Sequence, residues 1–172
     1  MTGEYLTPVP LHADHRRDAF ECNSYEQTRW LREYALTSQQ AGSTRVNVVT
    51  ERGSPAVVAY YAWTMGSVAV ADAPVRLTRG GGKYPQPVAL LARLGVDSAH
   101  ERVGLGSELL RDVMVRTVAV SQEIGCRALV VHCENEAARS WYLRRVPAFE
   151  QSPTDPMHLA LLTKDIRAAL GG

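Results

Sequence analysis

The stretch LLARLGVDSAHERVGLG, residues 90–106, decides the fold of this chain together with the amphipathic segment 107–124 that follows it. This order predicts a buried strand, a short loop freed by its glycines, and a helix. The first backbone N–H groups of a helix have no intrahelical acceptor, and they point the same way as the positive end of the helix dipole. Such a unit is an anion site, and a pyrophosphate is its natural guest.

The glycine pair Gly104 and Gly106 does not by itself say which pyrophosphate binds. It is not a dinucleotide fingerprint, because the third glycine of GxGxxG would fall at Leu109 and no acidic residue ends the following strand. It is not a P-loop, because no GK[ST] follows. The identity of the ligand must come from the rest of the chain.

The composition of the 172 residues suits one compact domain over residues 1–172, because 45% of them are hydrophobic and can bury a core. The formal net charge is +1, so attraction to a polyanion depends on local clusters of basic residues. Lys83 and Lys164 are the only lysines; the other basic residues are arginines, which make better bidentate phosphate contacts.

The three cysteines, Cys22, Cys126 and Cys133, argue against a disulfide framework and against a zinc site, because their number is odd and no CxxC spacing occurs. No segment approaches the ~18–20 apolar residues that span a bilayer, and the N-terminus has no signal-peptide pattern. We therefore expect a cytoplasmic protein with no membrane segment and no metal.

Upstream of the central unit, the pattern predicts a helix and a hairpin. Ser24 is the expected N-cap of a helix that ends at about Ser38, with apolar side chains at three- and four-residue steps. The runs 45–50 and 56–64 are typical of paired strands joined by the turn 51–55.

Two further upstream segments are less regular. Residues 5–10 predict an edge strand limited by its prolines, and residues 72–86, rich in Gly and Pro, predict a mobile surface loop.

The apolar run 88–96 predicts a central strand buried on both faces. The helix after it carries an apolar stripe and a solvent-facing side, to which we assign Asp112. Residues 128–132 predict a parallel neighbour of the central strand, reached through a crossover. The remaining expected elements are a helix from 135 to about 144, brief strands at 148–150 and 157–162, and a frayed helix at 165–170.

A second unit, NEAARSWY at residues 135–142, follows the predicted parallel strand. Together with residues 90–124 it resembles the GNAT acyl-CoA N-acetyltransferases, whose pyrophosphate loop precedes a strand and a helix bearing an asparagine and then a tyrosine. The resemblance covers residues 20–162. It implies an α/β fold with a GNAT-like mixed central sheet, antiparallel in its N-terminal strands and parallel in the central pair, flanked by helices.

The resemblance narrows to one branch, the aminoacyl-tRNA-acetylating toxins of bacterial type II toxin–antitoxin systems. The segments that are similar to this branch lie at 20–22, 30–31, 41–45, 58–62, 93–97 and 152–157. Membership would imply a cytoplasmic enzyme that blocks translation, with aminoacyl-tRNA and a small ribbon-helix-helix-type antitoxin as partners, and a homodimer as its assembly.

The resemblance also implies acetyl-CoA as the acetyl donor and a set of site residues. Tyr142 would be the general acid that donates a proton to the departing sulfur. The backbone near the strand end would hold the pantetheine arm, and the N–H groups of the loop would hold the pyrophosphate. The expected acetyl-CoA contacts are Leu94, Gly95, Val96, Arg102, Val103, Gly104, Leu105, Gly106 and Asn135.

Two positions depart from the GNAT loop pattern. Glu101 stands where the family has Gln or Arg, and Arg102 stands where a glycine is common. Glu101 would repel a pyrophosphate, so either its side chain points to solvent or Arg102 supplies the missing positive group.

No carboxylate or histidine is an obvious general base. A lysine amine, with a pKa of about 10.4, would need one, whereas an α-amino group titrates at about 7.7–8.0 and is already partly neutral. This favours an α-amino acceptor. His132 and Cys133 are adjacent in a strand and point to opposite faces, so a structural role is favoured over a thiol nucleophile with its base.

Several basic residues are candidates for contacts with tRNA phosphates. Solvated surface charge is the simpler interpretation of the same residues, and the resemblance favours RNA for part of the set. Arg93 lies in an apolar strand, so it is either paired internally or turned toward the acceptor. The set is Arg76, Arg79, Lys83, Arg93, Arg139, Arg144 and Arg145.

Two alternatives keep the fold. One is a GNAT acetyltransferase of a small amine, an antibiotic or a protein N-terminus. The other is a non-catalytic module that binds acyl-CoA or a partner protein, which Glu101 makes conceivable.

Overall fold

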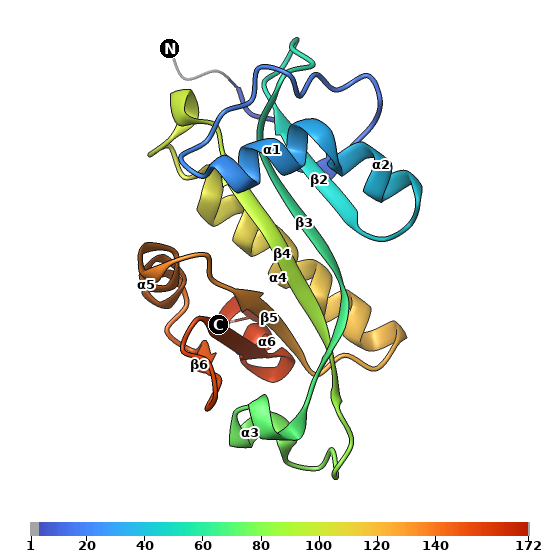
Figure 1. Ribbon diagram of the computed structural model, residues 1–172, viewed down its shortest axis with the longest axis vertical. Helices are drawn as coiled ribbons and strands as arrows, with labels where there is room; N and C mark the ends of the chain where they lie inside the picture. The colour runs from blue at the N-terminus through green and yellow to red at the C-terminus, as the bar shows by residue number, and fades with distance from the viewer. Residues whose placement is uncertain (1–3, 172) are drawn as a thin grey trace. The chain divides into compact units, whose positions relative to one another are not determined.

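The computed structural model describes residues 4–171, and its hydrogen-bonded strands follow the order β1-β2-β3-β4-β5-β7-β6 (Figure 1). Strands β4 and β5 pair in parallel, whereas β1–β2, β2–β3, β5–β7 and β6–β7 are antiparallel. The predicted mixed α/β sheet is therefore confirmed. The strands are β1 (Val9–Pro10), β2 (Arg45–Thr50), β3 (Val57–Val68), β4 (Gln86–Val96), β5 (Ala128–His132), β6 (Glu150–Gln151) and β7 (His158–Leu162).

The chain divides into two compact units, each described here by itself. The first holds residues 4–64 and 92–112, and the second holds residues 65–91 and 113–171. The helices are α1 (Tyr25–Glu33), α2 (Ala35–Gln40), α3 (Val75–Thr78), α4 (Leu105–Glu123), α5 (Glu136–Arg145) and α6 (Thr163–Gly171), with short 3-10 turns η1 (Val70–Asp72) and η2 (Ser98–His100).

In the first unit, the expected N-cap of α1 is present, because the Ser24 hydroxyl accepts a hydrogen bond from the Gln27 N–H at 3.2 Å. The predicted single helix to Ser38 is wrong in one respect. Tyr34 leaves the helical region at φ −120°, so the segment forms α1 and α2 in succession.

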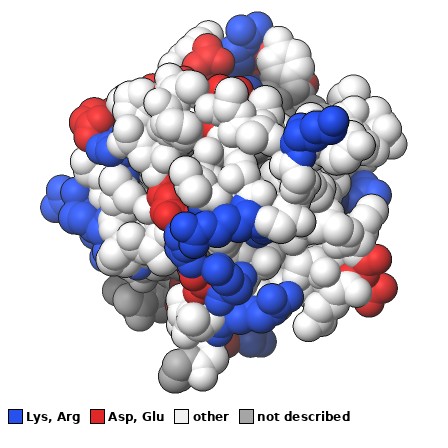
Figure 2. All heavy atoms as spheres, turned by 90° about the horizontal axis from the view of Figure 1, so that it is seen from below, with Lys and Arg blue, Asp and Glu red and all other residues white. Residues whose placement is uncertain are grey.

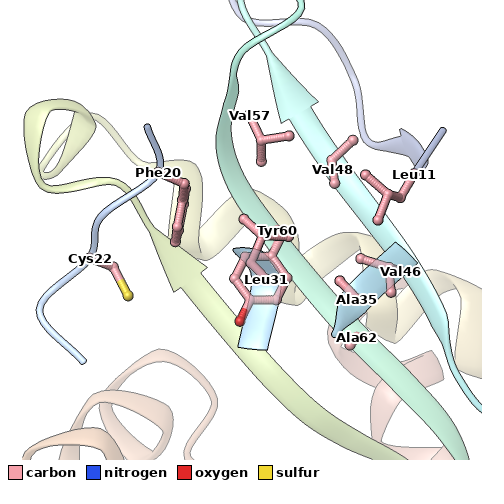
Figure 3. Close-up of a cluster of buried hydrophobic side chains, with 10 residues drawn as sticks. All are labelled: Leu11, Phe20, Cys22, Leu31, Ala35, Val46, Val48, Val57, Tyr60 and Ala62. Carbon is pink, nitrogen blue, oxygen red and sulfur yellow. The ribbon is translucent and has the colours of Figure 1, made fainter. Parts of the chain in front are cut away.

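Both helices bury apolar side chains on the β2–β3 hairpin, which was predicted and which pairs from Arg45↔Trp63 to Thr50↔Val57. Figure 3 shows Leu31 and Ala35 beside Tyr60, with Val46 and Val48 on the neighbouring strand. The predicted edge strand 5–10 shrinks to β1 and an isolated bridge between Tyr5 and Glu51.

In the second unit, the segment predicted as a surface loop is partly core. Ala73 and the α3 residue Leu77 are buried against Val88, Val130 and other side chains of β4, β5 and β7. The loop prediction is therefore wrong for residues 73–78. Two apolar residues among prolines and glycines make no helical period, so the sequence pattern did not reveal this contact.

Helix α4 has the predicted apolar stripe, with Leu105, Leu109 and Val113 buried. Asp112, assigned to the solvent-facing side, is half-buried, and its carboxylate also accepts a hydrogen bond from the Tyr61 hydroxyl at 2.6 Å. The prediction that residues 88–96 are buried on both faces holds only for residues 88–91, since Ala92 is exposed. The C-terminal segment predicted as frayed forms the regular helix α6.

No helix within residues 4–171 is long and apolar enough to cross a membrane.

Candidate active site

The first unit holds the end of β4, the loop after it and the start of α4. Asp97 fastens this strand end to the rest of the unit. Its N–H donates to the Val58 carbonyl oxygen at 2.8 Å, and its carboxylate accepts the N–H groups of Glu21 at 3.0 Å and Ala99 at 2.9 Å. Sequence reasoning missed this role, although an aspartate directly before a short turn is a typical capping signal.

Gly95 lies in a closely packed part of β4. A Cβ atom at this position would stand 3.2 Å from the Tyr60 ring, 3.4 Å from the Cys22 sulfur and 3.5 Å from the Phe20 ring. The predicted cofactor residue is therefore a glycine for packing reasons as well. Because Gly95 has no side chain, the β4 backbone can lie close to the core of the first unit.

The loop after β4 has two residues with positive φ. Gly104 has φ +92°, which glycine adopts freely, and Arg102 has φ +62°, which an L side chain disfavours. The family's common glycine at the Arg102 position thus has a conformational reason. Glu101 and Arg102 are both exposed. Glu101 therefore agrees with the first alternative given above, in which its side chain points to solvent.

Helix α4 begins at Leu105, and its first closing bond runs from the Glu108 N–H to the Gly104 carbonyl oxygen at 3.0 Å. The N–H groups of residues 105–107 precede that bond and have no intrahelical acceptor. They lie at the positive end of a 19-residue helix. The first unit therefore has backbone N–H groups without intrahelical acceptors at the loop where an anion is predicted to bind.

The second unit holds Tyr142, on α5. Its side chain is buried at 7% exposure, and its ring packs edge-on against Trp141 and Phe149, with centroids 5.0 and 5.9 Å away. Burial, and to a smaller degree the neighbouring Cys133, raises the pKa of the Tyr142 hydroxyl. Tyr142 is therefore protonated at neutral pH, as a proton donor must be.

Cys133 follows β5 and is also buried. Its N–H donates to the Met157 carbonyl oxygen at 2.7 Å. Burial raises the pKa of the Cys133 thiol to about 11, against a weaker opposing effect of Arg139. The thiol is neutral at physiological pH, which agrees with the prediction that it is not a nucleophile.

Asn135 is the N-cap of α5, because its side-chain oxygen accepts the Ala138 N–H at 2.9 Å. The Arg139 side chain makes hydrogen bonds in the same region. It donates to the Pro156 carbonyl oxygen at 2.9 Å and to the Gln151 side chain at 2.6 Å. These two residues hold α5 in place, and their predicted contacts with ligands stay predictions.

The basic residues differ in what they already contact. Arg76 donates to Asp165 at 2.9 and 3.0 Å and to Glu150 at 3.2 Å. In the first unit, Arg93 is half-buried and its guanidinium lies over the Trp30 ring, 5.5 Å from the ring centre. Arg145 lies 4.7 Å from the Trp141 ring centre. The exposed members of the set are Arg79, Lys83, Arg144 and Arg145.

Figure 2 shows the molecule from below, the end at which Figure 1 places α3. Lys and Arg side chains gather near the middle of this face, with fewer Asp and Glu side chains beside them. Two hydrogen bonds from Arg127 hold the loop between α3 and β4 in place. Arg127 donates to the Gln86 side chain at 3.0 Å and to the Arg79 carbonyl oxygen at 2.7 Å. Sequence reasoning missed both bracing residues, which carry no local motif.

Within residues 4–171, no three His, Cys, Asp or Glu side chains are grouped so that they could hold a metal ion. The three cysteines are free and buried.

Comparison with known proteins agrees with this geometry. The model of the acetyltransferase (GNAT) family matches residues 14–146. A protein of Mycobacterium tuberculosis (strain ATCC 25618 / H37Rv) named tRNA-acetylating toxin is 46% identical over 142 residues, which are 83% of this chain and 82% of the relative.

Solved structures of bacterial toxins have the same fold. The complex of AtaT with acetyl-methionyl-tRNAfMet superimposes with a TM-score of 0.87 at 20% identity, covering 97% of this chain and 99% of that chain. A tyrosine-to-phenylalanine mutant of AtaT, bound to the C-terminus of the antitoxin AtaR and to acetyl-CoA, gives a TM-score of 0.82 at 19% identity, covering 98% and 99%.

Proposed function

Because the chain belongs to the acetyltransferase (GNAT) family, we propose that it is a toxin that transfers the acetyl group of acetyl-CoA to the α-amino group of aminoacyl-tRNA. The observation that carries this proposal is the 46% identity to the tRNA-acetylating toxin of Mycobacterium tuberculosis, over 83% of this chain. An acetylated α-amino group is an amide and no longer a nucleophile, so the charged tRNA cannot accept a peptide and translation stops.

The first unit supplies the donor's anchor. The N–H groups at the start of α4 and the loop from Arg102 to Gly106 are the proposed contacts of the acetyl-CoA pyrophosphate. The exposed guanidinium of Arg102 adds positive charge where Glu101 adds negative charge. The backbone of residues 94–96, at the end of β4, is the proposed contact of the pantetheine arm.

The second unit supplies the proton donor. The amine nitrogen bonds to the thioester carbonyl carbon, the carbon–sulfur bond breaks, and the departing thiolate takes the hydroxyl proton of Tyr142. A buried, protonated tyrosine suits this step, because the proton is available at neutral pH. The amine nitrogen gives one proton to solvent water in the same reaction, and the Tyr142 phenolate then takes a proton back from water.

Charged tRNA also needs phosphate contacts. Arg79, Lys83 and Arg144 are exposed, and they are the proposed members of such a surface. Arg145, although stacked on Trp141, remains exposed and can contribute. The Arg76 guanidinium forms ion pairs with Glu150 and Asp165, so its proposed role is to hold these neighbours in place and not to contact a phosphate.

The remaining parts of the proposal concern context. A small ribbon-helix-helix-type antitoxin would restrain the enzyme, and a homodimer would be its assembly. The described helices include none that could span a membrane, and charged tRNA is a cytoplasmic substrate, which supports a cytoplasmic location.

The test is incubation of the protein with labelled acetyl-CoA and total charged tRNA. We expect label on the aminoacyl group, released by mild alkali as an N-acetyl amino acid. Label on added small amines or peptide N-termini but not on tRNA would select the alternative acceptors. No transfer, together with no thermal shift on adding acetyl-CoA, would select a partner-binding module.

Tyr142→Phe tests the proton donor. Loss of the hydroxyl should lower kcat about 100-fold or more, the usual worth of a positioned acid. The Kd for acetyl-CoA, measured by calorimetry, should stay unchanged. Tyr25→Phe is the matched control, because Tyr25 is 75% exposed. Full activity of Tyr142→Phe would reject the assigned role.

A further inference from the structure

The loop between α3 and β4, residues 79–85, lies wholly in the second unit and carries an aromatic side chain that the proposed mechanism does not use. Tyr84 is 70% exposed, so its ring is not part of the core. Arg79 and Lys83 are exposed in the same loop. The loop therefore offers an aromatic ring and neighbouring cations to solvent.

The backbone of this loop is held by two polar side chains. Gln86, which is 2% exposed, donates to the carbonyl oxygens of Gly81 at 3.2 Å and Tyr84 at 2.8 Å. Arg127 donates to the Gln86 side-chain oxygen at 3.0 Å and to the Arg79 carbonyl oxygen at 2.7 Å. Moving the loop would leave a buried amide without partners, which is costly. The exposed side chains are therefore presented by a preorganised backbone.

The charge of this region has one sign. Between residues 73 and 96 the sequence has no Asp or Glu, and its basic residues are Arg76, Arg79, Lys83 and Arg93. Glu150 and Asp165 approach α3 from other elements, and both form ion pairs with Arg76. Basic side chains gather on the lower face of the molecule in Figure 2, the end at which Figure 1 places α3 and this loop. The exposed part of the loop therefore suits a polyanion.

An aromatic ring beside cations is the combination that binds uncovered bases of RNA. Lys and Arg contact phosphates, and the ring stacks on a base, which tolerates any sequence because every base has an aromatic face. A base inside a duplex is covered by its neighbours, so stacking needs an unpaired nucleotide or the last base pair of a stem. An acidic protein could also satisfy the cations, but the proposed substrate, charged tRNA, supplies both phosphates and uncovered bases.

We propose that Tyr84 stacks on an uncovered base of the charged tRNA and that Arg79 and Lys83 contact neighbouring phosphates. This inference deepens the proposed function and rests on it, because it adds a base contact to the proposed phosphate surface. No bond forms or breaks at Tyr84, so it is a binding residue and not a catalytic one. Its contribution belongs to the affinity for tRNA, and the affinity for acetyl-CoA does not depend on it.

The test is the Kd for labelled deacylated tRNA, measured by fluorescence anisotropy at one fixed salt concentration. Tyr84→Ala should weaken binding about 10-fold, within the usual range for one stacked base. Tyr84→Phe should bind within twofold of the wild type, because its ring stacks equally well. Tyr25→Ala is the matched control, since Tyr25 is a 75% exposed tyrosine of the first unit, and it should match the wild type.

Salt dependence separates stacking from charge. In Lys83→Gln, the slope of log Kd against log salt concentration should decrease by about one, because one phosphate contact is lost. Tyr84→Ala should bind more weakly at every salt concentration with the slope of the wild type. A changed slope in Tyr84→Ala, equal to that of Lys83→Gln, would overturn the stacking assignment.

Two RNA minihelices identify the base. If Tyr84→Ala weakens binding of a minihelix with an unpaired 3′ end but not of the same stem with a blunt end, the ring stacks on an unpaired nucleotide. If it weakens both equally, the ring stacks on the last base pair. If it weakens neither, the proposal is wrong.

The KM for charged tRNA links this site to the proposed reaction. In Tyr84→Ala it should rise by the same factor as the Kd, while kcat and the calorimetric Kd for acetyl-CoA stay at the wild-type values. An unchanged urea midpoint shows that the variant is folded.

Failure of this inference differs from failure of the proposed function. Wild-type acetylation of tRNA together with a wild-type Kd for Tyr84→Ala overturns the stacking alone, as does a Tyr84→Phe protein that binds as weakly as Tyr84→Ala. Weaker self-association of Tyr84→Ala in sedimentation, with an unchanged Kd for tRNA, would assign the loop to a protein partner and reject RNA. Tyr84-dependent binding of tRNA without any acetylation would reject the proposed function and keep the stacking.

Discussion

The Tyr61 hydroxyl donates to the Asp112 carboxylate at 2.6 Å and joins β3 to α4 inside the first unit. Tyr61 is fully buried, so its hydroxyl must find a partner within the protein. The bond fixes the first half of the helix whose N-terminus is the proposed anion site. It is also the reason that Asp112 does not behave as a residue of the solvent-facing side.

Tyr61→Phe should therefore lower the free energy of unfolding by about 1.5–3 kcal/mol, the usual worth of a hydrogen bond to a charged group. Urea denaturation measures the change. Tyr25→Phe, at an exposed tyrosine, should leave stability unchanged. A Tyr61→Phe protein as stable as the wild type would mean that Asp112 finds an equal partner in water.

Arg102→Gly should stabilise the protein and lower its affinity for acetyl-CoA. An L residue at φ +62° destabilises the folded state by about 1–2 kcal/mol, which glycine relieves. Glycine also loses more backbone entropy on folding, which costs about 0.5–1 kcal/mol. The free energy of unfolding should therefore rise by about 0.5–1 kcal/mol. Arg102→Ala removes the same guanidinium but keeps the strained backbone. Both variants should bind acetyl-CoA severalfold more weakly in calorimetry, and only Arg102→Gly should resist more urea.

Gly95→Ala should destabilise the first unit. The added methyl would stand 3.2 Å from the ring of Tyr60, which is fully buried. Overpacking costs about 1–3 kcal/mol, and the lower entropy of the unfolded alanine chain returns about 0.4–1 kcal/mol. Gly66→Ala is the matched strand control, because its methyl would meet neighbours at 3.8 Å. Equal urea midpoints for the two variants would contradict the packing argument.

Stability should fall between pH 9 and pH 11 because of Cys133. The unfolded thiol ionises near its ordinary pKa of 9.0, whereas the folded thiol stays neutral up to a pKa of about 11. The stabilisation is therefore complete below pH 9 and is lost as pH rises toward 11, with a loss of about 1 kcal/mol by pH 10. Urea denaturation at pH 8 and pH 10 measures it. Cys133→Ala should show a clearly smaller loss; an identical loss would assign the effect to other groups.

Much of the fold was predictable because its signals are local. The apolar run of β4, the stripe of α4 and the two strand-forming runs of the hairpin with their turn each lie within about 20 residues. Ser24 and Asn135 cap helices through contacts three residues away. The burial of Leu77 was missed, because it depends on what the second unit packs against that residue, and the break at Tyr34 was missed because no helix-stop residue marks it.

The sequence by itself determined the family and the order of the elements, because motif spacing and hydrophobic period are properties of neighbouring residues. Only the tertiary structure decided which polar groups meet. The Arg76–Asp165 pair joins residues 89 positions apart, and the His132–His158 stack arises from the register of β5 on β7. The first pairing depends on how α3 and α6 pack, and the second depends on strand register, where a slip of one residue would turn each side chain to the other face; no local pattern records either.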